Sequence, residues 1–200
     1  MEKFKELGIS EELLRAIHEE GFTEPSEVQE KTIPLVLAGK DVIGSSATGS
    51  GKTLAFGAGI IDRISPGKGI QALIMTPTRE LAEQVGQTIA KFGHKKRLRV
   101  AQIYGGVSMV PQVNILRHVD IVVGTPGRLL DHIKSRTINL SRIKFLVLDE
   151  ADRMLDMGFI RDVESIINFC PKERQTLLFS ATMSQDIEYM ARKHMRNPIP

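Results

Sequence analysis

Six short β-rich segments recur along this 200-residue chain, and each is followed by a segment with a helix-like pattern. Several of them are apolar throughout, which is typical of strands buried on both faces of a parallel sheet. Strands that alternate with helices predict right-handed crossovers, so we expect an α/β fold with a mostly parallel, twisted sheet and helices on both faces. The expected strands lie at residues 41–44, 72–76, 99–104, 120–124, 143–148 and 176–180.

Helical patterns fill the intervals and also precede the first strand. The later ones lie at residues 80–92, 128–134 and 186–196. Near the N-terminus, the cap residue Ser10 predicts a helix that stops at Gly21, and a second helix is expected from Ser26 to about Ala38. Because these two helices come before the sheet, they should pack against it or cover a ligand at its edge. We therefore divide the chain into a helical extension at residues 1–40 and an α/β domain at residues 41–200.

Composition excludes several other classes of protein. An apolar fraction of 42% and a charged fraction of 26% are ordinary for a globular domain. The single cysteine, Cys170, excludes an intrachain disulfide framework and a cysteine-cluster metal site, and it fits a reducing compartment. No apolar run approaches the ~18 residues of a membrane span, and the charged N-terminus lacks a signal core, so we expect a cytoplasmic protein without membrane contact. The net charge of +3 permits nucleic-acid binding without indicating it.

The strongest local motif follows the first expected strand and opens a helix. Gly49 and Gly51 let the backbone turn tightly so that its N–H groups face an anion, and the helix adds its positive end. Lys52 supplies a charge for the β- and γ-phosphates, and the Thr53 hydroxyl can ligate Mg²⁺. Since the strict phosphate-loop pattern has Gly where this chain has Ser46, a Gly/Ser-rich turn before a helix is the alternative. The candidate nucleotide-binding segment is Ser46, Ala47, Thr48, Gly49, Ser50, Gly51, Lys52 and Thr53.

Two carboxylates end the apolar strand expected at residues 143–148. In open α/β sheets ligands bind at the carboxyl ends of strands, so Asp149 can face the same site as Lys52. Asp149 would hold Mg²⁺, directly or through water, and Glu150 would orient and deprotonate an attacking water. The alternative is that both acids only start the next helix, where negative charge favours the helix dipole.

Residues 149–152 spell D-E-A-D, and with the phosphate loop they resemble the DEAD-box family of ATP-dependent RNA helicases. Further segments are similar to family motifs, occur in the family's order and extend the resemblance from Phe4 to the C-terminus. These segments are residues 77–82 (PTRELA), 105–106 (GG), 125–128 (TPGR) and 180–182 (SAT). The resemblance implies a RecA-like P-loop NTPase domain, specifically the N-terminal, ATP-binding domain of such a helicase.

The resemblance also implies an adenine-reading element at residues 21–29. Thr23 and Gln29 match it, and the Gln29 amide can donate to and accept from an adenine edge. The chain departs from the family at residues 26–27, where Thr-Pro is common. Phe4 stands where the family uses an aromatic residue to stack on the base; the alternative is that Phe4 packs an N-terminal helix.

On the RNA side, the resemblance implies contacts to the backbone and sugars of one strand, with no sequence preference. By itself, the segment at 125–128 would also fit a β-turn that leads into a helix. The basic run at residues 94–99 would either widen an RNA-binding face or form a solvated loop. The implied RNA-binding residues are Pro77, Thr78, Arg79, Gly105, Gly106, Thr125, Pro126, Gly127 and Arg128.

Asp152, Ser180 and Thr182 are implied to couple ATP hydrolysis to RNA separation through hydroxyl hydrogen bonds to Asp152. The alternative is that Ser184 caps a helix while Ser180 and Thr182 are buried and satisfied.

Family members carry a second RecA-like domain, whose arginines stabilise the transferring phosphoryl group. No arginine-rich motif follows Thr182 here. The resemblance implies a monomer that binds ATP, Mg²⁺ and single-stranded or duplex RNA. Hydrolysis should be feeble, and unwinding absent, until a second domain is joined to the chain. An ATP-dependent RNA clamp and a small-molecule kinase are competing readings. The kinase would leave the segments around Thr78 and Thr125 unexplained.

Overall fold

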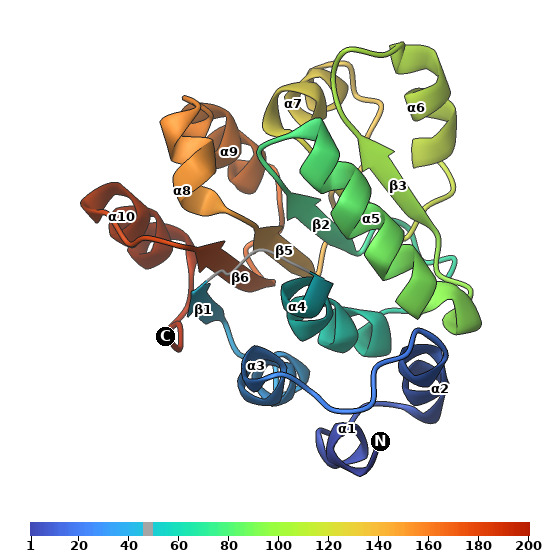
Figure 1. The fold of residues 1–200 in the computed structure, drawn as a ribbon. Coiled ribbons are helices and arrows are strands. Elements are labelled where there is room, and N and C mark those ends of the chain that lie inside the picture. The colour runs from blue at the N-terminus through green and yellow to red at the C-terminus, as the bar shows by residue number, and fades with distance from the viewer. Residues whose placement is uncertain (46–49) are drawn as a thin grey trace.

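A computed structural model describes residues 1–45 and 50–200, apart from the Ser50 side chain (Figure 1). Six strands form one sheet in the order β1-β6-β5-β2-β4-β3, and every neighbouring pair is parallel. The expected α/β fold is therefore confirmed, with a sheet that is entirely parallel in the described residues. The strands are β1 (Val42–Ser45), β2 (Ala72–Met75), β3 (Val100–Ile103), β4 (Ile121–Gly124), β5 (Phe145–Leu148) and β6 (Gln175–Ser180).

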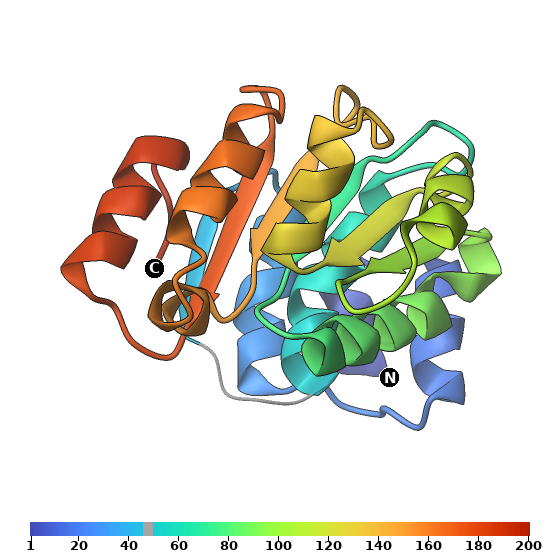
Figure 2. The ribbon, with the colours of Figure 1, turned by 90° about the horizontal axis from the view of Figure 1, so that it is seen from above.

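Helices cover both faces of the sheet (Figure 2). The first face is covered by α1 (Glu2–Glu6), α2 (Glu11–Glu19), α3 (Glu27–Leu37), α4 (Ser50–Arg63) and α5 (Arg79–Gly93), and α5 continues into the short 3₁₀ helix η1 (His94–Lys96). The opposite face is covered by α6 (Met109–Leu116), α7 (Pro126–Lys134), α8 (Ala151–Asp156), α9 (Ile160–Asn168) and α10 (Gln185–His194).

The central strand β2 shows why the apolar runs form buried strands. Ala72 and Ile74 belong to the hydrophobic cluster under α1–α5, whereas Leu73 and Met75 belong to the cluster under α6–α10. Successive side chains of a strand point to opposite faces, so a strand covered on both faces is apolar at every position.

The two predicted N-terminal helices are present. Ser10 caps α2, and Ser26 caps α3 in a capping box with Gln29. Helix α3 packs so closely on α4 that a Cβ atom at Gly59 would overlap the Val36 side chain, which requires glycine at that position. Helix α1 was not predicted, because five residues are too few to show helical periodicity. The division at residue 40 stays a prediction, since α1–α3 share one hydrophobic cluster with α4 and α5.

Among the helices of the described residues, none combines the length and the apolar character that crossing a membrane requires.

Candidate functional site

The predicted phosphate-loop, acidic and RNA-side motifs follow the carboxyl ends of strands. Because the strands are parallel, these ends meet at one edge of the sheet. Helix α4 and Lys52 follow β1, and the segments that begin at Pro77, Gly105 and Thr125 follow β2, β3 and β4. Asp149 comes directly after β5. One edge of the molecule therefore carries residues that are about 100 positions apart in the chain.

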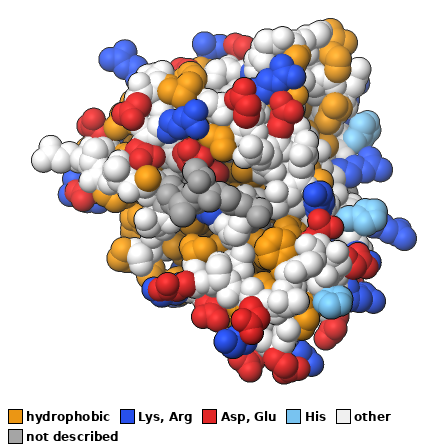
Figure 3. Space-filling model, viewed as in Figure 1, with side chains coloured by type: hydrophobic (Ala, Val, Ile, Leu, Met, Phe, Trp, Pro, Cys, Tyr) orange, Lys and Arg blue, Asp and Glu red, His pale blue; other side chains and the backbone are white. Residues whose placement is uncertain are grey.

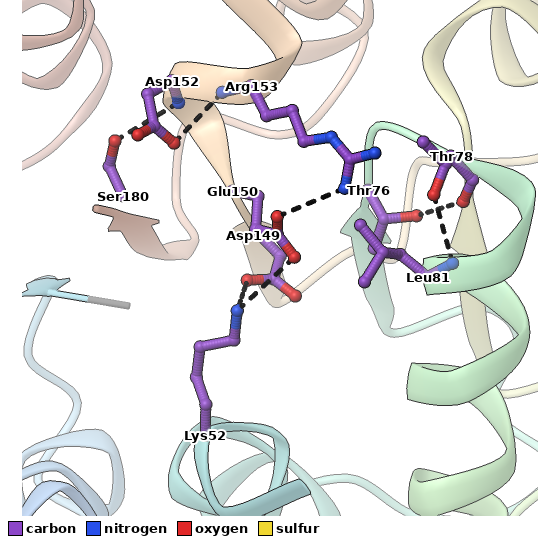
Figure 4. A network of polar contacts seen from close by, with 9 residues as sticks. All are labelled: Lys52, Thr76, Thr78, Leu81, Asp149, Glu150, Asp152, Arg153 and Ser180. Carbon is purple, nitrogen blue, oxygen red and sulfur yellow. Dashed lines mark hydrogen bonds and ion pairs between the residues drawn. The ribbon is translucent and has the colours of Figure 1, made fainter. Parts of the chain in front are cut away.

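Lys52 and Asp149 meet at this edge, as the sequence predicts (Figure 4). The Lys52 Nζ atom lies 2.8 Å from Asp149 Oδ1 and 3.9 Å from Glu150 Oε2. Lys52 is 7% exposed and Asp149 is 1% exposed, so the pair is withdrawn from solvent. A buried ion pair is strong only where its geometry and hydrogen bonds are good, and here the oxygen nearest Lys52 accepts no well-directed bond.

Asp149 Oδ1 accepts no well-directed hydrogen bond, although the Lys52 ammonium lies at ion-pair distance. Burial raises the pKa of the Asp149 carboxyl, and the positive charge of Lys52 offsets only part of that rise. The ionised carboxylate therefore depends on nearby positive charge, which Lys52 supplies in this structure. Thr53, with a buried hydroxyl group, follows Lys52 in α4.

Glu150 has an unusual backbone conformation. Its φ of 53° and ψ of 53° place a residue with a side chain in the left-handed region, which costs roughly 1 kcal/mol or more and is concentrated at functional sites. Glu150 is the N-cap of α8, yet its side chain makes no capping hydrogen bond. The side chain instead faces Lys52 and lies 3.7 Å from Arg153 Nη1. Glu150 thus precedes α8 without capping it through its side chain.

A cavity of about 530 Å³ adjoins Lys52, Thr53, Asp149 and Glu150 and extends along α5. The residues of α5 that line it were not predicted, because polar side chains at helical spacing look like an ordinary solvated face. They are Leu81, Gln84, Val85, Gln87, Thr88 and Lys91.

Gln29 links the predicted adenine element to the start of α4. Its Oε1 atom accepts a hydrogen bond from the Ser26 N–H at 2.9 Å, and its Nε2 group donates to the Gly51 carbonyl at 3.1 Å. Gln29 is 2% exposed, so these bonds fix its amide. Thr23 is exposed, and its carbonyl accepts a hydrogen bond from the N-terminal ammonium of Met1.

Phe4 requires a correction. Its ring has no exposed surface and lies in the hydrophobic cluster under α1–α5. It packs the N-terminal helix, the alternative that the sequence left open, and neither face of the ring is accessible to a base in this structure.

Part of the phosphate-loop prediction cannot be compared with the structure. Ser46, Ala47, Thr48 and Gly49 lie outside the described residues, as does the side chain of Ser50. Gly51 lies in the first turn of α4, close enough to Gln29 that a Cβ atom there would be 3.5 Å from its Nε2 atom.

The predicted RNA-side segments lie at the same edge of the sheet. Thr78 caps α5, and Pro77 before it is buried. Gly105 and Gly106 are exposed, and a φ of 82° at Gly106 favours glycine there. Thr125 is the N-cap of α7 but makes no side-chain capping bond, so its hydroxyl remains available. Pro126 is the first residue of that helix, and Gly127 and Arg128 follow in its first turn.

A buried polar network joins these segments. The Arg79 guanidinium lies 4.6 Å from the centre of the Tyr104 ring. Gln112 of α6, which is 6% exposed, donates to the Tyr104 carbonyl at 2.9 Å. Its Oε1 atom accepts from Arg128 Nη1 at 3.1 Å and lies 2.8 Å from His132 Nε2.

Arg128 Nη1 also donates to the Val107 carbonyl at 2.8 Å. Sequence reasoning missed Gln112, since no local pattern distinguishes it.

Asp152 contacts the segment after β6. Its carboxylate accepts hydrogen bonds from the hydroxyl and the N–H of Thr182, both at 3.1 Å, and its own N–H donates to Ser180 Oγ at 3.2 Å. Burial raises the pKa of Asp152, but the hydrogen bonds from Thr182, Arg153 and Ser180 outweigh that effect and the net pKa is lowered. Ser184 does cap α10, but Thr182 is exposed, so the alternative describes only part of this segment.

Comparison with known proteins identifies the family. The family model described as DEAD/DEAH box helicase matches residues 26–190. A probable ATP-dependent RNA helicase of Methanocaldococcus jannaschii is 48% identical over 193 residues, which are 96% of this chain and 53% of that protein. The DEAD-box ATP-dependent RNA helicase CshA of Geobacillus kaustophilus is 50% identical over 200 residues, 99% of this chain and 43% of that protein.

Solved structures agree with this assignment. The crystal structure of a DEAD box protein from Methanococcus jannaschii superposes with a TM-score of 0.94 at 47% identity, and the match covers 98% of this chain and 54% of that chain. The chain thus spans about half the length of the relatives it matches. The expected RecA-like fold is confirmed, and the chain belongs to the DEAD/DEAH box helicase family.

Proposed function

We propose that this chain is the ATP-binding domain of an RNA helicase, which binds Mg-ATP and one strand of RNA. Hydrolysis and duplex separation would require a second RecA-like domain. The observation that carries the proposal is the buried Lys52–Asp149 pair at the carboxyl edge of the sheet. A P-loop enzyme binds Mg-ATP through a lysine that contacts the phosphates and a carboxylate that holds Mg²⁺.

Lys52 would exchange Asp149 for the β- and γ-phosphates. Asp149 and Thr53 would hold Mg²⁺, which neutralises charge on the phosphates. The Asp149 carboxylate would be released when Lys52 turns to the phosphates, and the buried Thr53 follows Lys52 in α4, so both residues fit this role. The described residues contain no cluster of three or more His, Cys, Asp or Glu side chains suited to a metal ion. Phosphate oxygens and waters would complete the shell, as Mg²⁺ usually requires.

Glu150 would act as the general base. Its backbone conformation directs the carboxylate toward the same cavity as Lys52, within 3.9 Å of the ammonium. A carboxylate held this way can orient a water and accept its proton. Gln29, through Gly51, would fix the phosphate loop relative to the adenine element that includes Thr23.

The RNA strand would follow the loops after β2, β3 and β4. Exposed glycines allow phosphates to approach backbone N–H groups, the Thr78 and Thr125 hydroxyls can donate, and Arg79 is exposed. Because these groups reach phosphate and sugar, we propose binding without sequence preference. Asp152 and Thr182 would couple the bound RNA to the nucleotide. Asp152 lies three residues from Asp149, and its carboxylate accepts a hydrogen bond from Thr182 in the loop after β6.

Gln112→Leu should weaken RNA binding about tenfold and leave ATP binding unchanged. The substitution removes hydrogen bonds that position Arg128 and the loop after Tyr104, and hydrogen bonds to a charged group contribute about 1.5–3 kcal/mol. RNA and ATP affinities are measured separately, in a protein that joins this chain to a second RecA-like domain. Gln185→Leu, at an exposed position, is the control. Equal losses of both affinities would indicate general damage to the fold and contradict the positioning role.

The proposal is tested by measuring ATP binding and turnover on the chain alone. We expect calorimetric titration to show Mg-ATP binding, and single-stranded RNA to leave the low turnover almost unchanged. An arginine finger from another domain accounts for ~10³–10⁵ in rate in related chemistry. Absence of ATP binding would refute the nucleotide site. Robust RNA-stimulated turnover would refute the need for a second domain.

A further inference from the structure

Two adjoining cavities lie at the edge of the sheet opposite the candidate site. Their volumes are about 360 Å³ and about 500 Å³, and they share Gly69, Arg117 and Val119. Gly69 precedes β2, Arg99 precedes β3 and Val119 precedes β4, so the cavities lie at the amino ends of these strands. We call this combined surface the arginine groove.

Five arginines line the groove, of the 14 in the chain. All five are exposed, and within the described residues none of their guanidinium groups makes an ion pair or a side-chain hydrogen bond. By contrast, the net charge of the whole chain is only +3, so positive charge is concentrated here. The five are Arg97, Arg99, Arg117, Arg136 and Arg142.

The groove extends the basic run at residues 94–99, whose first three residues form η1. Figure 3 shows Lys, Arg and His side chains along the edge where α5 ends, interspersed with Asp and Glu. The exposed imidazole of His118 also lines the groove. The run is thus continued by residues from three other parts of the chain, which the alternative of an isolated solvated loop does not predict.

The floor of the groove is fixed before any ligand arrives. Asp120, the one acid among the lining residues, is 3% exposed, and its oxygens accept from the Gly67 N–H at 3.0 Å and the Arg99 N–H at 2.8 Å. Gln71, which is 1% exposed, holds the same loop through Ser65 and Gly69. Both side chains are used inside the protein, so neither the carboxylate of Asp120 nor the amide of Gln71 competes for a ligand of the exposed guanidinium groups.

Guanidinium groups can donate bidentate hydrogen bonds to phosphate oxygens, and they are less strongly hydrated than ammonium groups. Five of them distributed over two adjoining cavities suit a chain of phosphates better than a single small anion. Clustered like charges repel one another, so a polyanion relieves an unfavourable field.

We propose that the arginine groove binds the phosphodiester backbone of RNA as a second contact, separate from the edge with Lys52 and Asp149. Only the choice of RNA as the polyanion rests on the proposed function. The lining residues all belong to this chain, so the contact needs neither nucleotide nor a second domain.

The test compares two triple variants that lose the same charge. Arg97→Gln, Arg99→Gln and Arg117→Gln remove charge from the groove. Arg15→Gln, Arg161→Gln and Arg192→Gln remove it from exposed positions elsewhere. Affinity of the chain for a 40-nucleotide single-stranded RNA is measured by fluorescence anisotropy, without nucleotide, over a range of salt concentrations. Melting temperatures verify that both variants are folded.

We expect the groove variant to bind about tenfold more weakly at low salt and with a shallower salt dependence, because each lost phosphate contact reduces the slope by about 0.7 for single strands. The control variant should lose about twofold or less. Equal losses in the two variants would overturn the proposal. Polyglutamate is titrated as a second probe. If the groove variant keeps its RNA affinity but loses binding of polyglutamate, the proposal is also overturned, because that result would indicate an acidic protein partner. If the wild-type chain binds no RNA, both the inference and the proposed RNA binding fail. If the wild-type chain binds RNA and the groove variant binds it equally tightly, the inference fails and the proposed function stands.

Discussion

Lys52→Ala should weaken Mg-ATP binding by this chain at least about a hundredfold, below detection by calorimetry. The ammonium lines the cavity and lies 2.8 Å from Asp149, and charged hydrogen bonds to phosphate contribute up to about 3 kcal/mol. The change also leaves Asp149 buried without its cation, and breaking a buried pair costs about 3–5 kcal/mol of stability. A loss of binding must therefore be separated from a loss of folding.

The double variant Lys52→Ala with Asp149→Asn makes this separation. It removes both charges, so the fold should recover much of its stability, while Mg-ATP binding should stay lost. Lys134→Ala, at an exposed position, is the control and should bind normally. Unchanged ATP affinity in a folded Lys52→Ala variant would remove Lys52 from the nucleotide site.

Glu150→Gln should lower kcat for RNA-stimulated ATP hydrolysis by about 10²–10⁴ and leave ATP affinity nearly unchanged. Glutamine keeps the size of the side chain and its hydrogen-bonding ability but accepts no proton. The measurement requires this chain joined to a second RecA-like domain, for example the remainder of the CshA relative, because the chain alone should turn over too slowly.

Glu173→Gln, at an exposed position, is the matched control for loss of one carboxylate and should leave kcat unchanged. Normal turnover by Glu150→Gln would show that another group handles the water. Loss of ATP binding together with kcat would instead give Glu150 a role in holding the nucleotide.

Much of the fold and the centre of the site were predictable from the sequence. A strand such as β2, with four buried apolar residues in succession, can be recognised in the sequence because a strand covered on both faces is apolar at every position. That Lys52 and Asp149 share an edge follows from topology: once strands alternate with helices and run parallel, the residues after β1 and β5 lie at the same edge. Their contact also depends on the strand order β1-β6-β5, which no local pattern specifies.

Other features depend on contacts that no local pattern records. Phe4 is buried in a cluster built from five helices, so its motif position alone did not indicate that its ring lies in the core. Gln112 connects Tyr104, Arg128 and His132 across two helices, and polar residues in short helices are common. The left-handed backbone of Glu150 is set by tertiary structure, since glutamate has no intrinsic preference for it.

The central claim is that the triphosphate and Mg²⁺ insert between the Lys52 ammonium and the Asp149 carboxylate. A crystal structure of the chain with Mg²⁺ and a non-hydrolysable ATP analogue tests it most directly. We predict that the 2.8 Å pair opens, with the ammonium on the phosphates and the carboxylate facing the metal ion or one of its waters. An analogue bound elsewhere, with that pair still closed, would contradict the account.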